Sequence, residues 1–202
     1  MPGIWRKGFG IMPAVKLLSF SGSLRPGSFN QRLVDRATAA AREAGAEVTQ
    51  INLADFALPL FTPQIEAEAF PQGARELKAL FVGHAGFLIA SPEYNGSVSG
   101  ALKNAIDWVS RPTDGEGLVA LSAFRNKVAG IMSASISPFG GLRGLMHLRQ
   151  ILNTVQTLVV TEQVAVAFAE RAFDGDVLVD ALANQLLSPL VRRVIKLSRT
   201  AA

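Results

Sequence analysis

The sequence predicts a single three-layer α/β domain in which a five-stranded parallel sheet lies between two layers of helices. Two observations carry this prediction. Short apolar runs alternate with segments of helical periodicity along the chain, which is the pattern of right-handed βαβ units. The chain has 202 residues, which is enough for one such domain and short for two. Five units of this kind fit a doubly wound sheet with strand order 2-1-3-4-5.

In the first half, a strand is expected at residues 15–20, where an apolar run ends in small polar residues. The helix after it spans residues 30–44, because apolar residues recur there at spacings of one, three and four, and Gly45 closes it. The next expected elements are a strand at 47–51, a helix at 74–82, a strand at 86–90 and a helix at 99–110. Residues 52–72 are Pro-rich and irregular, and a segment of this length suggests a functional or interface role.

In the second half, residues 127–133 are apolar on both faces, which predicts a strand covered on both sides. The elements expected after it are a helix from Gly140-Gly141 to Leu152, a strand at 157–166 and a last helix at 177–197. Pro189 should kink that last helix or split it in two. Residues 1–13 are expected to be a flexible N-terminal extension, and residues 14–202 the single domain.

The composition excludes several kinds of chemistry. There is no cysteine, so disulfides, thiolate nucleophiles and cysteine-ligated metals are excluded, and a reducing, cytoplasmic environment fits. The two histidines, His84 and His147, have no second ligand at metal-binding spacing, so we expect no metal site.

Charge and apolar run length restrict the partners. The net charge is +4, but the basic residues form no dense run with interleaved aromatic residues, so we expect no nucleic-acid partner. Those of the last helix are spaced like a solvated face: Arg192, Arg193, Lys196 and Arg199. No apolar run reaches the roughly 18 residues that a bilayer span needs, so we expect no membrane partner.

The first motif, residues 20–30, follows the first strand and reads Phe-Ser-Gly-Ser-Leu-Arg-Pro-Gly-Ser-Phe-Asn. Its glycines permit a tight turn, its serines and Asn30 are short hydrogen-bonding groups, and Arg25 offers a charged fork beside a helix N-terminus. These features suit a phosphate group, although a Ser/Gly turn that only caps a helix has the same composition. The spacing matches neither the P-loop nor the dinucleotide fingerprint.

Two further motifs also stand between a strand and a helix. Residues 91–97 read Ser-Pro-Glu-Tyr-Asn-Gly-Ser: Tyr94 offers an aromatic plane, and Asn95-Gly96 can turn backbone N–H groups toward a ligand. Residues 133–141 are small enough for a planar ligand to lie close to the chain, which is a weak signal by itself. Because ligands of open α/β sheets bind outside the carboxyl ends of the strands, the motifs suggest one site for a flavin mononucleotide.

The motifs resemble those of a known family. Gly22-Ser-Leu-Arg25 with Ser28-Phe-Asn30, Pro92-Glu-Tyr-Asn-Gly-Ser97 and Gly100-Ala-Leu-Lys-Asn-Ala-Ile-Asp-Trp108 are similar to segments of the NADPH-dependent FMN reductases, a family of the flavodoxin-like superfamily. The similarity runs in order from about residue 15 to residue 150. One departure is Ser137-Pro-Phe139, where the family often has a glycine-containing turn.

The resemblance implies bound FMN, with NAD(P)H, and NADPH in particular, as co-substrate. The implied FMN-binding residues are Ser21, Ser23, Arg25, Ser28, Phe29 and Asn30 around the phosphate, Pro92, Glu93, Tyr94, Asn95 and Gly96 along the ring, and Ser133, Ser135, Gly140 and Gly141 at its other edge. It also implies a homodimer or homotetramer, to which residues 52–72 or Tyr94 contribute from a neighbour. Lys103, Asn104, Asp107 and Trp108 are interpreted as structural or interfacial.

The expected activity is ping-pong transfer of a hydride from NAD(P)H through FMN to a quinone or a similar small acceptor, such as flavin, chromate or an azo compound. Since the cofactor carries this chemistry, no catalytic side chain is predicted. Three alternatives remain open at this stage: an FMN-binding electron carrier with a protein partner, a reductase of diffusible FMN, and a non-catalytic anion-binding module.

Overall fold

The five predicted strands form one parallel sheet in the order β2-β1-β3-β4-β5, which confirms the predicted fold class. The computed structural model describes residues 13–113 and 115–201, so the predicted N-terminal extension lies, except for Pro13, outside the described residues. The strands are β1 (Lys16–Ser21), β2 (Glu47–Asn52), β3 (Gly86–Ala90), β4 (Val128–Ala134) and β5 (Leu158–Val166).

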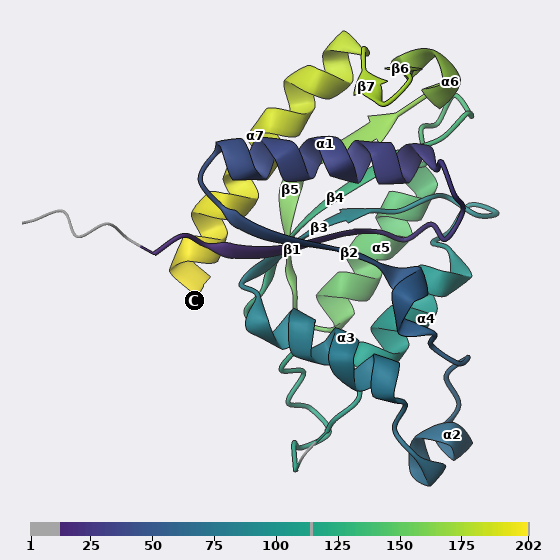
Figure 1. Cartoon of the computed structure of the whole chain (residues 1–202), viewed down its shortest axis with the longest axis vertical. Coiled ribbons are helices and arrows are strands. Elements are labelled where there is room, and N and C mark those ends of the chain that lie inside the picture. Colours follow the sequence, from purple (N-terminus) through teal and green to yellow (C-terminus); the bar gives the residue numbers. More distant parts are fainter. Residues whose placement is uncertain (1–12, 114, 202) are drawn as a thin grey trace, which may run out of the picture.

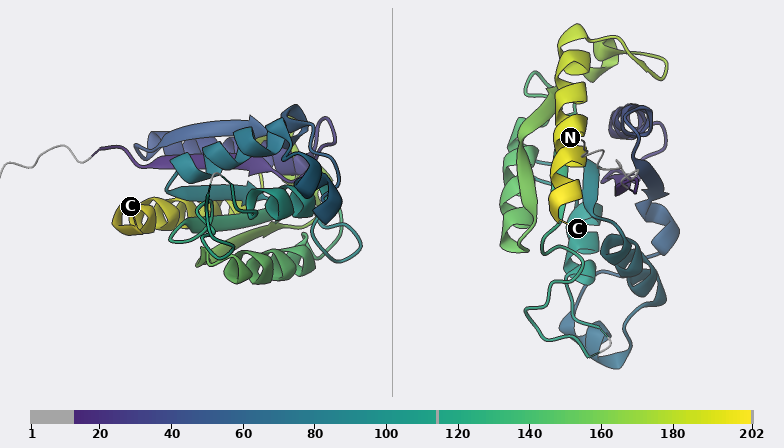
Figure 2. Two further views of the ribbon diagram at one scale, coloured as in Figure 1. Left: turned by 90° about the horizontal axis from the view of Figure 1, so that it is seen from below. Right: turned by 90° about the vertical axis from the view of Figure 1, so that its left-hand side faces the viewer.

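Helices cover both faces of this sheet (Figure 1 and Figure 2). On one face lie α1 (Phe29–Glu43) and α7 (Ala181–Ala201); on the other lie α3 (Gln72–Gly83), α4 (Gly100–Val109) and α5 (Leu142–Thr154). Side chains of the central strand β3 pack into the cores on both sides of the sheet, because successive side chains of a strand point to opposite faces. Leu88 belongs to the core under α1 and α7, whereas Phe87 and Ile89 belong to the core under the other three helices.

The Pro-rich segment after β2 is more ordered than predicted. It contains a 3-10 helix, η1 (Leu53–Phe56), and a short helix, α2 (Pro63–Glu68), whose first turn is capped by the Thr62 hydroxyl. The segment is pinned to α4, where Trp108 Nε1 and Asn104 Nδ2 both donate to the Pro59 carbonyl oxygen, at 2.7 and 2.9 Å. These two side chains therefore have a structural role, which is one of the two roles, structural or interfacial, that the sequence predicts for them.

The predicted last helix, 177–197, is wrong at its start and in its proposed split. After the short helix α6 (Ala169–Ala172), β6 (Phe173–Asp174) and β7 (Val177–Leu178) form a hairpin, and α7 begins only at Ala181. Each strand of this hairpin has only two residues, which is too few to show the alternation of apolar and polar residues that predicts a strand. The helix runs unbroken through Pro189, which is exposed, while Leu187 and Leu190 on either side are buried in the core.

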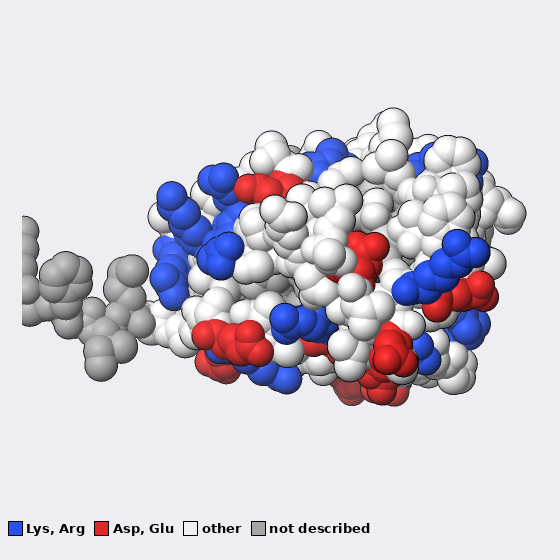
Figure 3. All heavy atoms as spheres, turned by 90° about the horizontal axis from the view of Figure 1, so that it is seen from above, with Lys and Arg blue, Asp and Glu red and all other residues white. Residues whose placement is uncertain are grey.

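The side of the molecule formed by α1 and α7 carries both positive and negative side chains, with positive ones gathered near the end where the termini lie (Figure 3). The four basic residues named on α7 are exposed, and Arg193 donates to the Glu162 carboxylate at 2.8 Å. Within the described ranges, no helix is both long and apolar enough to cross a bilayer.

A buried ion pair fixes the segment between α4 and β4. The Lys78 ammonium, on α3, is 5% exposed as a residue and donates to Glu116 and to the Arg111 carbonyl oxygen, the latter at 2.6 Å. Glu116 also accepts from the Ser122 hydroxyl and from the Thr113 N–H. Burial raises the pKa of Glu116, but these hydrogen bonds and the Lys78 charge outweigh it and lower that pKa to about 2.

Glu116→Gln should lower the free energy of unfolding at neutral pH by roughly 2 kcal/mol, because the buried Lys78 loses its counter-charge. The folded-state pKa of Glu116 lies below the ordinary glutamate value of 4.5. Ionised Glu116 therefore stabilises the fold above pH 4.5, and this contribution is lost as the pH falls toward 2. Urea unfolding at pH 7 and pH 3 measures the effect, with the exposed Glu68→Gln as the control. A deficit that is equally large at both pH values would contradict the prediction.

Candidate cofactor site

The three predicted motifs meet at one edge of the sheet. Ser21, at the end of β1, pairs with Ala90 of β3, and Ala90 pairs with Met132 of β4. Because parallel strands end at the same edge, the loops after β1, β3 and β4 lie next to one another. They enclose a cavity of about 370 Å³. Its lining residues are Ser23, Arg25, Ser28, Phe29, Asn30, Pro92, Glu93, Tyr94, Ala134, Ser135, Ile136 and Glu170.

The loop after β1 is folded by its own serine hydroxyls. Ser21 Oγ accepts the Ser23 N–H at 3.1 Å, and Ser23 Oγ accepts the Arg25 N–H at 3.3 Å. Ser28 Oγ caps α1 by accepting the Asn30 N–H at 3.2 Å. A hydroxyl that accepts one hydrogen bond still has its own hydrogen to donate, so Ser23 and Ser28 can each donate to a ligand oxygen in the cavity.

The start of α1 adds positive potential to the same cavity. No acidic residue stands in its first turn, so the partial positive charge of the helix N-terminus is not neutralised locally. Arg25 is exposed and lines the cavity, and no ion pair occupies its guanidinium among the residues that the structure describes. Together these groups suit a phosphate dianion.

Asn30 positions the loop as well as lining the cavity. Its side-chain Nδ2 donates to the Ala134 carbonyl oxygen at 2.9 Å, and its Oδ1 accepts the Ala134 N–H at 3.0 Å. Both polar groups of this buried amide are thus used within the protein. The pair fastens the start of α1 to the end of β4.

The second motif presents Tyr94 at the cavity on a tight turn. The Tyr94 N–H donates to the Ser97 carbonyl oxygen at 2.9 Å, and the Ser97 N–H returns a bond of 3.0 Å. The two residues between them have positive φ, 51° for Asn95 and 79° for Gly96, as in a type I′ turn. Tyr94 remains 49% exposed, so one part of its ring is available to a ligand.

Glu93 links the second motif to α5. Its carboxylate accepts the Gly144 N–H at 3.0 Å and the Arg143 Nε–H at 2.7 Å, both from the first turn of that helix. Burial raises the pKa of Glu93, but the Gly144 and Arg143 hydrogen bonds and the Arg143 charge outweigh it, so the pKa lies below its usual value. Glu93 stays ionised and holds the motif against α5.

The third motif contributes less to the cavity than predicted. Ser135 lines it, whereas Ser133, Gly140 and Gly141 do not. A Cβ on Gly141 would lie 1.9 Å from Ser133 Oγ, so glycine is needed there for close packing within the loop. Ser21, Asn95 and Gly96 also lie outside the lining, in supporting positions.

Three lining residues were missed from the sequence: Ala134, Ile136 and Glu170. The first two lie inside the third motif and could have been included with it. Glu170 follows β5, in the segment where the sequence pattern predicted only the end of a strand and a later helix. No signal in that segment points to the cavity.

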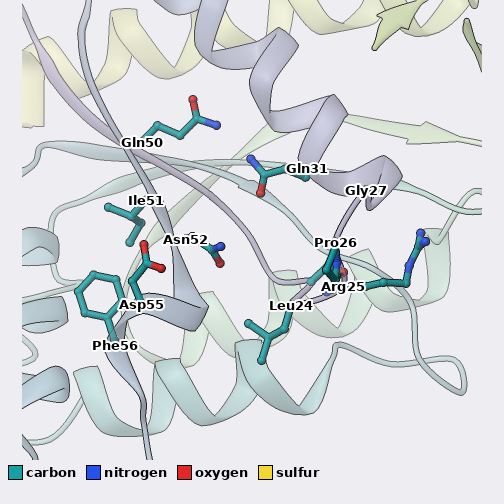
Figure 4. A pocket seen from close by; sticks show the side chains of 11 residues that line it. Leu24, Arg25, Pro26, Gly27, Gln31, Gln50, Ile51, Asn52, Asp55 and Phe56 are labelled. Atoms are coloured by element: carbon teal, nitrogen blue, oxygen red, sulfur yellow. Dashed lines mark hydrogen bonds between the residues drawn. The ribbon is translucent and has the colours of Figure 1, made fainter. Parts of the chain in front are cut away.

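A larger cavity, of about 560 Å³, lies on the other side of the first loop (Figure 4). Its wall includes Gln31 and Gln50, whose amides both donate to the Asp35 carboxylate, and the acidic Asp55. The Arg25 side chain extends away from Gln50 and Asp55 (Figure 4). Ser23 and Arg25 line this cavity too, but Ser28, whose hydroxyl caps the start of α1, lines only the smaller cavity, which is therefore the better anion site.

The sheet order and the cavity together define a class: a flavodoxin-like fold with a cavity at the carboxyl edge of its sheet whose lining suits a phosphorylated, flat ligand. Residues 15–171 match the NADPH-dependent FMN reductase family, and the chain belongs to that family. This confirms the predicted resemblance and the predicted class of enzyme, an NAD(P)H-dependent flavin oxidoreductase.

Individual proteins agree with this membership. The chain is 36% identical to the NAD(P)H-dependent FMN reductase of Pseudomonas aeruginosa over 86% of this chain and 89% of that protein. It is 35% identical to the quinone reductase of Escherichia coli K12, over 73% and 74%. The solved structure of FerB, a flavoenzyme NAD(P)H:(acceptor) oxidoreductase from Paracoccus denitrificans, superposes with a TM-score of 0.78 at 24% identity, over 93% of this chain and 99% of that one.

The residues present fit FMN. Two hydroxyl donors, a helix N-terminus and a guanidinium share the cavity with a half-exposed tyrosine ring, and a phosphate joined to a flat ring system needs both kinds of surface. Ser23, Arg25 and Ser28 would hold the phosphate, and Pro92 and Tyr94 would lie along the ring.

Arg25→Ala should weaken FMN binding about tenfold or more, since a hydrogen bond to a charged group contributes roughly 1.5–3 kcal/mol. Riboflavin, which lacks the phosphate, should bind equally well to both proteins. Quenching of flavin fluorescence measures both dissociation constants. Arg36→Ala, a change at an exposed arginine of α1 outside this cavity, is the matched control. An unchanged FMN affinity in Arg25→Ala would show that the phosphate is bound elsewhere.

Proposed function

We propose that this protein reduces a quinone or a similarly small, flat acceptor with electrons from NADPH, using FMN held in the 370 Å³ cavity. The observation that carries the proposal is that one cavity combines an anion cradle, formed by Ser23, Arg25 and Ser28 at the start of α1, with the half-exposed ring of Tyr94. When bound, FMN supplies the redox chemistry, accepting a hydride from the nicotinamide and giving two electrons to the acceptor.

The residues of this chain would bind the cofactor and orient its ring. Ser23, Arg25 and Ser28 anchor one end of the cofactor, which fixes where its ring can lie. Glu93, held to α5 by Gly144 and Arg143, sets the position of the second motif and its tyrosine. No side chain of the cavity needs to move a proton for this reaction, so we propose no catalytic acid or base.

A quinone fits the rim of the site. Ile136, in the loop after β4, lines the cavity and is 63% exposed, and Phe139, further along that loop and outside the lining, is 56% exposed. With Tyr94 they offer apolar surface to a flat acceptor, and the relatives named quinone reductases support this substrate class. Flavin, chromate and azo compounds are alternative acceptors. We propose a cytoplasmic location, where NADPH is supplied continuously.

The purified protein, loaded with FMN, should be bleached by NADPH under anaerobic conditions and should recover its colour on addition of benzoquinone. Stopped-flow absorbance near the flavin maximum follows both half-reactions, with NADH titrated in parallel to test the preference for NADPH. Bleaching by NADPH with no other protein present argues against an electron carrier, which would need a protein partner to receive its electrons. Co-elution of FMN in gel filtration argues against the reduction of diffusible FMN, and the absence of any bleaching would refute the proposal.

We also propose that the protein assembles as a homodimer or homotetramer through the exposed side of α5. Leu142 and Met146, one turn apart on that helix, are 41% and 62% exposed, and Phe139 precedes them. Exposed apolar side chains grouped in this way are typical of an interaction surface. The patch borders the site through Phe139 and Arg143, whose guanidinium lies 5.0 Å from the Phe139 ring centroid.

Met146→Lys should shift the protein toward the monomer, because a charge would be buried without a partner in the interface. Light scattering coupled to gel filtration measures the mass directly. Leu182→Lys is the matched control, since Leu182 is 64% exposed on α7, on the opposite side of the sheet. If Leu182→Lys dissociates the assembly and Met146→Lys does not, the interface lies on the other face.

A further inference from the structure

We propose that Glu170 is a selectivity residue of the cofactor site, whose carboxylate weakens the binding of a phosphorylated flavin relative to an unphosphorylated one. The inference rests on the proposed function, because it takes FMN as the occupant of the cavity. Glu170 lines the same cavity as Ser23, Arg25 and Ser28, the three residues that form the anion cradle. The other carboxylate of the lining, Glu93, is paired with Arg143 and the Gly144 N–H. Glu170 instead brings to the cradle a negative charge that is uncompensated within the described residues.

The backbone that carries Glu170 is fixed to the third motif. The Ala169 N–H donates to the Ser135 carbonyl oxygen at 3.0 Å, and the Phe168 N–H donates to the Ser137 carbonyl oxygen at 3.3 Å. Ala169 is fully buried in the core under α1 and α7. Helix α6 therefore starts at a defined place beside the cavity.

The other end of α6 is fixed to α1. The ring of Phe173 lies against that of Phe29, with centroids 5.7 Å apart, and Phe29 lines the cavity. On the hairpin that follows, Arg32 of α1 donates to the Gly175 carbonyl oxygen at 2.8 Å and lies 3.3 Å from an Asp176 carboxylate oxygen. The backbone of Glu170 thus stands between two anchored points, and the residue lines the same cavity as the cradle.

The Glu170 carboxylate has no hydrogen bond or ion pair within residues 13–113 and 115–201, and its residue is exposed. A carboxylate brings a negative charge, and a phosphate monoester carries a charge of about −1.5 to −2. The two repel each other. The uncharged remainder of the flavin does not feel this repulsion, so the cost falls on the phosphate alone.

A second use of the carboxylate, as an acceptor for the hydroxyls of the flavin side chain, predicts a different pattern. Riboflavin and FMN share those hydroxyls, so loss of the acceptor would weaken both ligands. Repulsion changes only the phosphorylated ligand. Comparison of the two flavins therefore separates the two roles without any measurement of turnover.

Glu170→Gln keeps the shape of the side chain and removes the charge. We expect FMN to bind about three- to tenfold more tightly to this variant, with riboflavin affinity unchanged. Dissociation constants come from the quenching of flavin fluorescence in apoprotein titrations at low ionic strength, where repulsion is screened least. Glu170→Ala should behave like Glu170→Gln. Asp174→Asn removes a charge four residues away, outside the cavity lining, and should leave both affinities unchanged.

The inference is overturned if FMN affinity in Glu170→Gln is unchanged or weaker, or if riboflavin affinity rises by the same factor. Thermal melting of the apoproteins checks that each variant is folded, and the exposed position of Glu170 makes a folding defect unexpected. If the unsubstituted protein binds neither flavin, the proposed function fails and this inference fails with it. If that protein binds FMN and the variant shows no change, only this inference fails.

Discussion

The site depends on one buried amide. Asn30 exchanges two hydrogen bonds with the backbone of Ala134, although 104 residues separate them in the sequence. Strand β3 lies between β1 and β4, so no ladder hydrogen bond can join the first loop to the third. Asn30 makes that connection at the edge of the sheet. Without it, the start of α1 and the end of β4 would be left with buried polar groups unpaired, and the cavity between them would lose its shape.

The Asn30 side chain also helps the first loop to bind an anion. Asn30 holds the first turn of α1 against β4. Ser28, the residue directly before the helix, caps that turn. The serine hydroxyls fold the loop as acceptors and keep their hydrogens for a ligand. Structure and binding therefore use different parts of the same side chains. A loop built in this way needs no ligand to hold its conformation.

Much of this was predictable, because it depends on local pattern. The alternation of apolar and helical segments predicts a parallel sheet, and five such units fit the order 2-1-3-4-5, which brings the three motifs to one edge. What the sequence could not show is which motif residues face the cavity. Gly141 and Ser133 pack against each other, and Glu93 binds the first turn of α5; both arrangements depend on distances between segments that are remote in sequence. The hairpin after β5 was missed because two residues per strand show no period.

Glu170 belongs to α6, directly before that missed hairpin, and its place has a general consequence. The loops after β1, β3 and β4 form the cradle and the surface proposed for the ring, and they contain motifs that resemble the family. The segment after β5 reaches the same cavity from the other side, through contacts to Ser135 and Phe29. It can therefore change the charge of the site without altering the loops that shape it. A substitution in the segment after β5 can thus change cofactor affinity while the loops that set the cofactor's geometry are kept.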